Sequence, residues 1–216
     1  MDSSVQKVMD SLEANNIKPY FVKTKQEVAP LVAQILNPGD VVTVGGSASL
    51  FETGVIDHLR SGRYTFLDRY APGLTEEDID EIYCNAMKAD AYFCSSNAVT
   101  QNGELYNVDG KANRIGAIAY GPKTVIMVVG TNKIVADLDA AIHRVKTITA
   151  PEICQRRNIK TYCREKGHCR SIANGQPGMT AGCGSPERVC CSYLVTGKQR
   201  TKDRIKVILV DESLGY

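Results

Sequence analysis

Apolar residues recur along the chain in two spacings, one typical of amphipathic helices and one typical of buried strands. Val5, Val8, Met9 and Leu12 fall at positions i, i+3, i+4 and i+7, which predicts a helix over residues 4–15. Short apolar runs predict strands at residues 20–22, 41–44, 64–67, 92–95, 123–129, 192–196 and 204–210. Helical patterns separate most of these runs. The alternation predicts an α/β domain with a mostly parallel central sheet and flanking helices.

Capping and turn residues mark where several of these elements begin and end. Thr24 with Glu27 forms a capping-box pattern before an apolar helical stretch, and Thr75 is placed to cap another helix. The pair Asn102-Gly103 separates residues 98–101 from residues 104–107, which predicts a hairpin with a type I′ turn, because both central residues of that turn need positive φ. The last two strands are expected on either side of the polar turn 197–200.

Length and composition limit the classes of protein to which the chain can belong. With 216 residues and 43% apolar content, the chain can bury a sizeable core, and we expect a single domain over residues 1–216. No apolar run approaches the roughly eighteen residues needed to cross a bilayer, and the first ten residues do not resemble a secretion signal. We therefore expect a cytoplasmic protein with no membrane span. Thiols stay reduced in that compartment, so clustered cysteines point to metal or redox chemistry more than to disulfides.

The net charge of +2 hides an uneven distribution. Residues 155–206 contain twelve Lys or Arg and only three Asp or Glu. This segment is interpreted as a solvated basic face, as compensation for a thiolate-rich site, or as a surface for an anionic partner. We expect no nucleic-acid partner, because stacking aromatic residues other than Tyr162 and Tyr193 do not alternate with the basic ones and no nucleic-acid motif is present.

The turn Gly45-Gly46-Ser47 follows the predicted strand 41–44 and precedes a helical stretch. Ligands of parallel α/β sheets gather at the carboxyl ends of the strands. Glycines let a ligand approach the backbone, and the N–H groups of the helix start, together with Ser47, would suit a phosphate or carboxylate. The alternative is an ordinary strand-to-helix turn, because the third glycine of the dinucleotide fingerprint and the Gly-Lys of a P-loop are missing.

Two further turns supply polar candidates for the same edge of the sheet. Arg114 is expected to present a bidentate fork to a carboxylate or phosphate. Lys133 follows the predicted strand 123–129. The other candidate ligand-binding residues of these turns are Asn107, Asp109, Gly110, Asn113 and Asn132. Asn and Asp also cap turns by bonding their own backbone, which is the structural alternative for this group.

Several ordered motifs together resemble one known family. They are VGGSASLFETG, NAVTQNGELYNVDGKANRIGA, GPKTVIMVVGTNKIVADLDAAIHRVK, CREKGHC, CGSPERVC and the closing VILVDESLGY. From about Val5 to the C-terminus the chain is similar to the LUD-domain family, whose members are associated with bacterial lactate utilisation. The resemblance implies a fold of the NagB/RpiA/CoA-transferase-like superfamily. It also implies a role in the oxidation of lactate to pyruvate beside iron–sulfur protein partners.

The resemblance supports the motif positions named above but no assigned catalytic set. Related folds use a glutamate near the first motif as the nucleophile in acyl transfer to coenzyme A, which makes Glu52 the catalytic candidate. Glu52 also completes a Ser49-x-x-Glu52 capping box, so a purely structural role is the alternative.

Five of the eight cysteines lie within residues 161–191. The family pattern is C-x5-C-x2-C-x6-C, and the chain keeps its first pair (Cys163 and Cys169) and its last pair (Cys183 and Cys190) around a longer spacer of thirteen residues. Four thiolates suit zinc or an iron–sulfur cluster. The lactate-oxidation setting and irregular spacing favour [4Fe-4S], with zinc as the alternative and reduced cysteines without metal as a third reading. We expect a Cys-rich metal-binding loop over residues 154–191 inside the single domain.

Two classes of function follow from the sequence. The first is an oxidoreductase component of lactate or other 2-hydroxy-acid utilisation, which binds a small carboxylate or phosphate ligand and a metal centre. The second is a non-catalytic accessory or regulatory subunit with a structural zinc site. An acyl or CoA transferase rests on fold analogy alone. The sequence leaves open whether turnover occurs in this chain or in a partner, and whether the chain forms a homo-oligomer.

Overall fold

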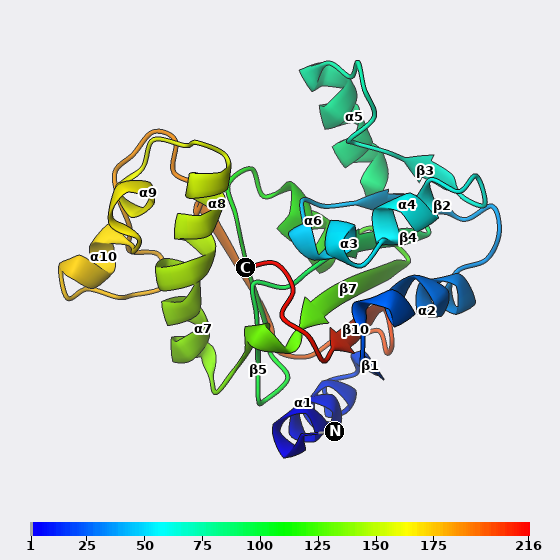
Figure 1. The fold of residues 1–216 in the computed structure, drawn as a ribbon, viewed down its shortest axis with the longest axis horizontal. Coiled ribbons are helices and arrows are strands. Elements are labelled where there is room, and N and C mark those ends of the chain that lie inside the picture. The colour runs from blue at the N-terminus through cyan, green and yellow to red at the C-terminus, as the bar shows by residue number, and fades with distance from the viewer. Residues whose placement is uncertain (1) are drawn as a thin grey trace.

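A computed structural model describes residues 2–216, and its centre is a six-stranded sheet (Figure 1). The strand order is β1-β10-β7-β4-β2-β3, and every pair of neighbours is parallel. In chain order the strands are β1 (Lys18–Val22), β2 (Val41–Val44), β3 (Thr65–Leu67), β4 (Ala91–Cys94), β7 (Thr124–Gly130) and β10 (Ile205–Val210). The expected parallel sheet of an α/β domain is confirmed.

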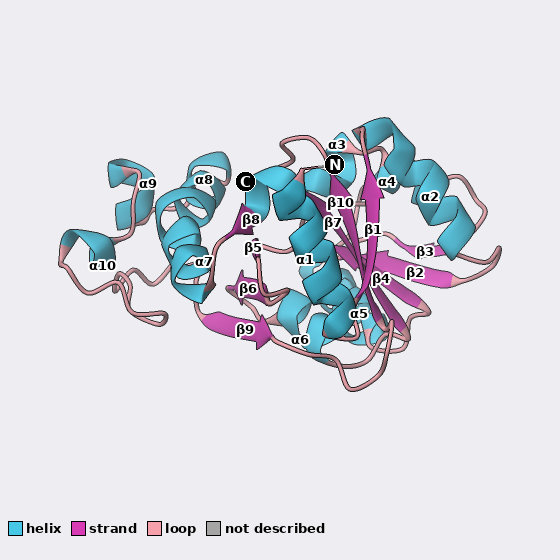
Figure 2. Ribbon diagram, turned by 90° about the horizontal axis from the view of Figure 1, so that it is seen from below, coloured by secondary structure: helices cyan, strands magenta, loops and turns pink. Residues whose placement is uncertain are grey.

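Helices cover both faces of this sheet (Figure 2). One face packs against α2 (Val28–Ile35), α3 (Ala48–Glu52) and α4 (Val55–Leu59), and a single turn of 3-10 helix, η1 (Lys25–Glu27), precedes α2. The other face packs against α1 (Ser3–Ala14), α5 (Glu76–Ala86) and α6 (Asn113–Ala119). Within residues 2–216 no helix combines the length and the apolar character needed to cross a membrane.

A second, four-stranded sheet has the order β8-β5-β6-β9. Its strands are β5 (Ala98–Thr100), β6 (Leu105–Asp109), β8 (Ile134–Val135) and β9 (Ser192–Thr196). Alternate residues of the hairpin β5–β6 enter different cores: Val99 and Leu105 pack with α1, whereas Ala98 and Tyr106 pack with the helices that follow β8. The hairpin is therefore buried on both faces, whereas the outer strands β8 and β9 are only partly buried.

The β5–β6 hairpin is confirmed, but its expected type I′ turn is wrong. Gly103 has a φ of +78°, whereas Asn102 does not adopt positive φ. The turn packs tightly against α1, where a Cβ on Gly103 would lie 2.7 Å from the carbonyl carbon of Ser11. Glycine is thus required here by both φ and space.

The two closing strands are confirmed, although they do not pair with each other. β9 runs antiparallel to β6 in the second sheet, and β10 lies between β1 and β7 in the first. The polar turn 197–200 therefore belongs to a connection between two sheets.

The cysteine-rich region lies at one end of the molecule, beside the second sheet (Figure 2). After β8 come α7 (Leu138–Arg144), one stretch of π-helix, η3 (Val145–Thr149), and α8 (Ala150–Arg156). Two short helices follow, α9 (Tyr162–Lys166) and α10 (Arg170–Ala173). Residues 154–191 are therefore partly helical, and only residues 174–191 form an extended loop before β9.

The segments that follow β2, β4, β7 and β10 meet at the carboxyl edge of the first sheet. The chain leaves β2 toward β3 on one side and leaves β4 toward β7 on the other, so the topology switches between β2 and β4. Such switch points form ligand-binding crevices in parallel sheets. The last residues of the chain fold back over this edge, where Leu214 N donates to Asn132 Oδ1 (3.1 Å) and Gly215 N donates to Glu52 Oε2 (2.9 Å).

Candidate functional site

A cleft of about 960 Å³ opens at this carboxyl edge. Its walls come from the turns after β2, β4 and β6, from η2 (Thr131–Lys133), from α8 and from the C-terminal residues. The sequence-predicted ligand residues that line it are Gly46, Ser47, Asp109, Gly110, Asn113, Arg114 and Lys133. Gly45 and Asn107 are buried behind the wall, and Asn132 bonds to the C-terminal segment. The structure thus brings the three predicted turns together around one cleft.

Arg114 is a buried structural hub of this cleft. Its Nε donates to Asp109 Oδ1 at 2.9 Å, within an ion pair in which both side chains are 9% exposed. The remaining N–H groups donate to Ser95 O, Asn107 Oδ1, Asn97 Oδ1 and Val108 O. An arginine has five N–H donors, and all five are used. The expectation that Arg114 presents an open fork to a ligand is therefore wrong, and Arg114 instead holds the neighbouring turns in place.

Glu52 lies outside the cleft lining. Its side chain is exposed and accepts the N–H of Gly215. The predicted Ser49–Glu52 capping box does not form, because Ser47 is the N-cap residue of α3 and Ser49 lies inside the helix. Through this hydrogen bond Glu52 links the C-terminal segment to α3.

Five basic side chains of the cleft lining lack an acidic partner. Residues 2–216 form five ion pairs, and none of them includes Arg69, Lys133, Arg156, Arg157 or Arg188. Basic residues at positions 156 and 157 were part of the basic segment seen in the sequence, but Arg69 was missed. Arg69 follows β3, so the rule that sites form at strand ends could have identified it.

The guanidinium groups of Arg69 and Arg157 approach the glycine turn. A Cβ on Gly46 would lie 3.4 Å from Arg157 Nη2 and 3.8 Å from Arg69 Nη1, so both guanidinium groups lie within contact distance of this turn. Arg69 is stacked over Tyr70 and Tyr83, with its guanidinium carbon 5.2 and 4.9 Å from the ring centroids. Its Nε and the Oγ of Ser47 are buried and have no hydrogen-bond partner among residues 2–216. This corner of the cleft therefore offers donors and positive charge without a protein anion.

Lys133 lies on the cleft wall and is only 3% exposed. Its Nζ donates to Ser49 Oγ at 3.1 Å and to Ser95 Oγ at 3.0 Å. Burial, followed by the positive charges of Arg144 and Arg114, lowers the pKa of Lys133 to about 7. A substantial fraction of this amine is therefore neutral near pH 7.

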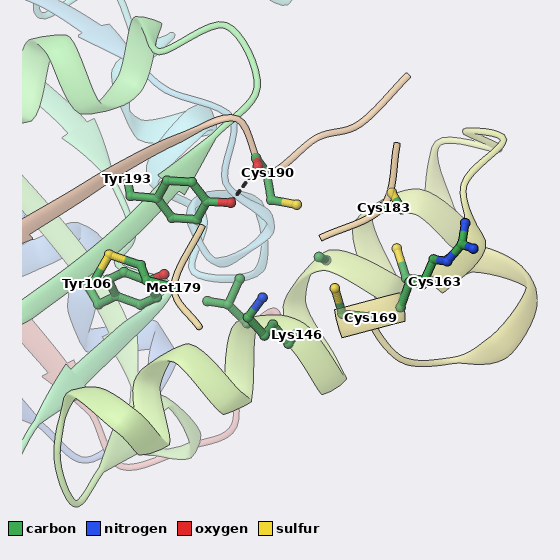
Figure 3. A pocket seen from close by; sticks show the side chains of 11 residues that line it. Tyr106, Lys146, Cys163, Cys169, Met179, Cys183, Cys190 and Tyr193 are labelled. Carbon is green, nitrogen blue, oxygen red and sulfur yellow. Dashed lines mark hydrogen bonds between the residues drawn. The ribbon is translucent and has the colours of Figure 1, made fainter. Parts of the chain in front are cut away.

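The four predicted metal-binding cysteines line a second, small cavity of about 20 Å³ (Figure 3). Cys163 lies on α9, Cys169 precedes α10, and Cys183 and Cys190 lie in the loop before β9. Figure 3 shows their sulfur atoms facing the same space. As they stand, no three His, Cys, Asp or Glu side chains within residues 2–216 are arranged to hold a metal ion. Cys191 is exposed and lies instead on the wall of the larger cleft.

Nearby positive charge and burial change the pKa of these thiols in opposite directions. Burial raises the pKa of Cys163 to about 12 and also raises the pKa of Cys190, although Arg188 Nε donates to Cys190 Sγ at 3.3 Å and opposes that rise. Lys146 and Arg170 add cations to the cavity lining. Lys146 was not identified from the sequence, because it lies in the π-helix, far along the chain from the cysteines. A metal would have to displace thiol protons on binding.

Comparisons with known proteins identify a matching family model and solved structures of similar fold. A family model described as the LUD domain matches residues 5–210. No curated protein matches the sequence. The chain is similar in fold to a DUF162 family protein of Deinococcus radiodurans, with a TM-score of 0.52, 16% identity and 96% of each chain covered. A weaker likeness is to eIF2B delta of Chaetomium thermophilum, with a TM-score of 0.35, 19% identity, 61% of this chain and 52% of that chain covered.

Proposed function

This chain belongs to the LUD domain family, which is associated with lactate utilisation, and from that premise we propose that it binds a small carboxylate or phosphate as a component of 2-hydroxy-acid metabolism. The observation that supports this proposal is the set of basic cleft residues without acidic partners within residues 2–216, namely Arg69, Lys133, Arg156, Arg157 and Arg188. Asp109, which is paired with Arg114, and Glu187 also line the cleft, but basic residues are in excess. A concave surface with an excess of one sign of charge concentrates the opposite ion. The helix α3, with five residues, contributes little, so side chains supply the charge.

Two buried donors indicate where a carboxylate would bind. Ser47 Oγ and Arg69 Nε lie without partners at the corner beside Gly46. A buried unsatisfied donor costs about 1–3 kcal/mol, and a carboxylate oxygen would remove that cost. Arg157 is exposed and lies beside the same glycine, so its guanidinium would close over the bound anion.

Calorimetric titration with lactate, pyruvate and inorganic phosphate tests this proposal. Arg157→Leu removes a charge-assisted hydrogen bond, for which about 1.5–3 kcal/mol is typical, so affinity should fall roughly ten- to hundredfold. Arg200→Leu is the matched control, because Arg200 is exposed and does not line the cleft. Equal affinities of both variants and the wild type, or no binding of any of the three anions, would contradict the proposal.

We further propose that Cys163, Cys169, Cys183 and Cys190 bind a metal through their thiolates. Their donor set fits a soft metal, and all four line one cavity. The lactate setting favours a [4Fe-4S] cluster, which would supply electron transfer with an iron–sulfur partner. The cavity volume of about 20 Å³ is close to the space of one water molecule, so a single zinc ion would need less rearrangement. In the zinc case, the chain would be an accessory subunit with a structural metal.

Iron, sulfide and zinc analysis of protein purified without oxygen distinguishes these centres. Cys163→Ser and Cys190→Ser should each lower the metal content markedly. Cys191→Ser is the control and should not, because Cys191 lies outside the cavity. Equal metal content in all three variants would remove the assignment.

A further inference from the structure

Lys133 is placed as a reactive group as well as a cation. Lys133 is the last residue of η2, which directly follows the central strand β7, and its side chain lines the cleft. Nζ lies between two hydroxyl groups, those of Ser49 and Ser95. Within residues 2–216 no carboxylate lies within ion-pair distance of this nitrogen. The amine is therefore held in position without being fixed in its charged form.

The two hydroxyl groups also orient the nitrogen. A neutral amine has two N–H bonds and one lone pair. When Ser49 Oγ and Ser95 Oγ accept the two N–H bonds, the lone pair is left without a protein partner and can attack an electrophile. Burial excludes water from competing for that lone pair.

We propose that the Lys133 amine condenses with the ketone carbon of a 2-oxo acid bound in the cleft to form an imine. The nitrogen lone pair attacks that carbon, the carbonyl oxygen gains the two protons lost by nitrogen, and it leaves as water. The serine hydroxyl groups beside Nζ can carry these protons. Hydrolysis reverses the step, so no oxidant or reductant is required.

This inference rests on the proposed anion site, because the carboxylate of the 2-oxo acid must bind there. In such an acid the ketone carbon is bonded directly to the carboxylate carbon, so anchoring the carboxylate brings the ketone within reach of a neighbouring group. A 2-hydroxy acid binds through the same carboxylate but has no electrophilic carbon at that position. Lys133 would thus distinguish the oxidised acid from the reduced one.

The protonation of Lys133 suits this chemistry. Lysine side chains that form imines are commonly activated by burial or by nearby cations. Burial is the main cause of the lowered pKa, with Arg144 and Arg114 adding to it, while Glu52 and Cys94 oppose it. The reactive neutral form therefore increases as the pH rises through about 7 and is nearly complete above about 8. An exposed lysine, with a pKa of about 10.4, would continue to gain reactivity up to pH 10.

Reductive trapping tests the proposal. Wild-type protein is incubated with pyruvate and sodium cyanoborohydride, and the product is analysed by intact mass and peptide mapping. We expect one reduced pyruvyl group per chain, located on Lys133, and none with lactate. Lys133→Arg keeps the positive charge and should give no adduct. Lys111→Arg is the matched control, because Lys111 lines the same cleft but is 70% exposed and should leave the adduct unchanged.

The outcomes separate this inference from the anion site itself. Calorimetric binding of pyruvate to the wild type without any adduct would overturn the imine and leave the anion site intact. Absence of both binding and adduct would overturn the anion site. An adduct spread over exposed lysines, with a yield that rises up to pH 10, would also overturn the imine. Peptide mapping of the wild type locates the adduct even if the Lys133→Arg variant does not fold.

Discussion

Replacing Arg114 with leucine should lower the free energy of unfolding, because Arg114 holds the neighbouring turns in place. The change deletes five hydrogen bonds and leaves the carboxylate of Asp109 without its cation, at a side chain that is only 9% exposed. The hydrogen bond from Ile115 N to Asp109 Oδ2 remains. Breaking a buried ion pair by removing one partner costs about 3–5 kcal/mol.

For a domain of this size, 1 kcal/mol changes Tm by about 2–4 °C, so Arg114→Leu should lower Tm by roughly 6–20 °C. Urea unfolding followed by circular dichroism measures the free energy directly, provided that the m-value is unchanged. Arg157→Leu is the matched control, since Arg157 is exposed and unpaired, and it should stay within about 0.5 kcal/mol of the wild type. A loss below about 1 kcal/mol for Arg114→Leu would refute the role of Arg114 as a structural hub.

Two other substitutions test the account. Gly103→Ala places a Cβ against α1 at positive φ and should cost about 1–3 kcal/mol in urea unfolding; an unchanged midpoint would contradict the hairpin geometry. Lys133→Met should make the protein more stable relative to wild type at pH 7 than at pH 9, because the pKa of Lys133 is about 7 when folded and about 10.4 when unfolded, so the unfolded chain binds more protons between these values. A difference in unfolding free energy that does not change with pH would show that Lys133 has an ordinary pKa.

Local patterns predicted most of the elements. The periodicity of Val5, Val8 and Leu12 identified α1, and the Thr75 cap of α5 is present, because these signals depend on residues within a few positions of one another. The partners of β9 and β10 could not be predicted, since pairing joins segments that are far apart in the chain. Periodicity does not show how little of α5 is buried: Ala86 is buried, whereas Cys84 on the same helix is exposed.

The site was predictable to the extent that sheet topology determines it. Turns at strand ends do meet around one cleft, as the strand pattern indicated. The use of all five N–H donors of Arg114 could not be predicted from the sequence. Its acceptors include the backbone carbonyls of Ser95 and Val108, and every residue type has a backbone carbonyl. The lowered pKa of Lys133 likewise follows from burial, which depends on the folded structure and not on neighbouring residues in the sequence.

A crystal structure of the protein grown with saturating pyruvate tests the proposed anion site. We expect the pyruvate carboxylate to lie beside Gly46, within hydrogen-bonding distance of Ser47 Oγ and Arg69 Nε. An empty cleft at saturating pyruvate, or pyruvate bound only elsewhere on the protein, would contradict it.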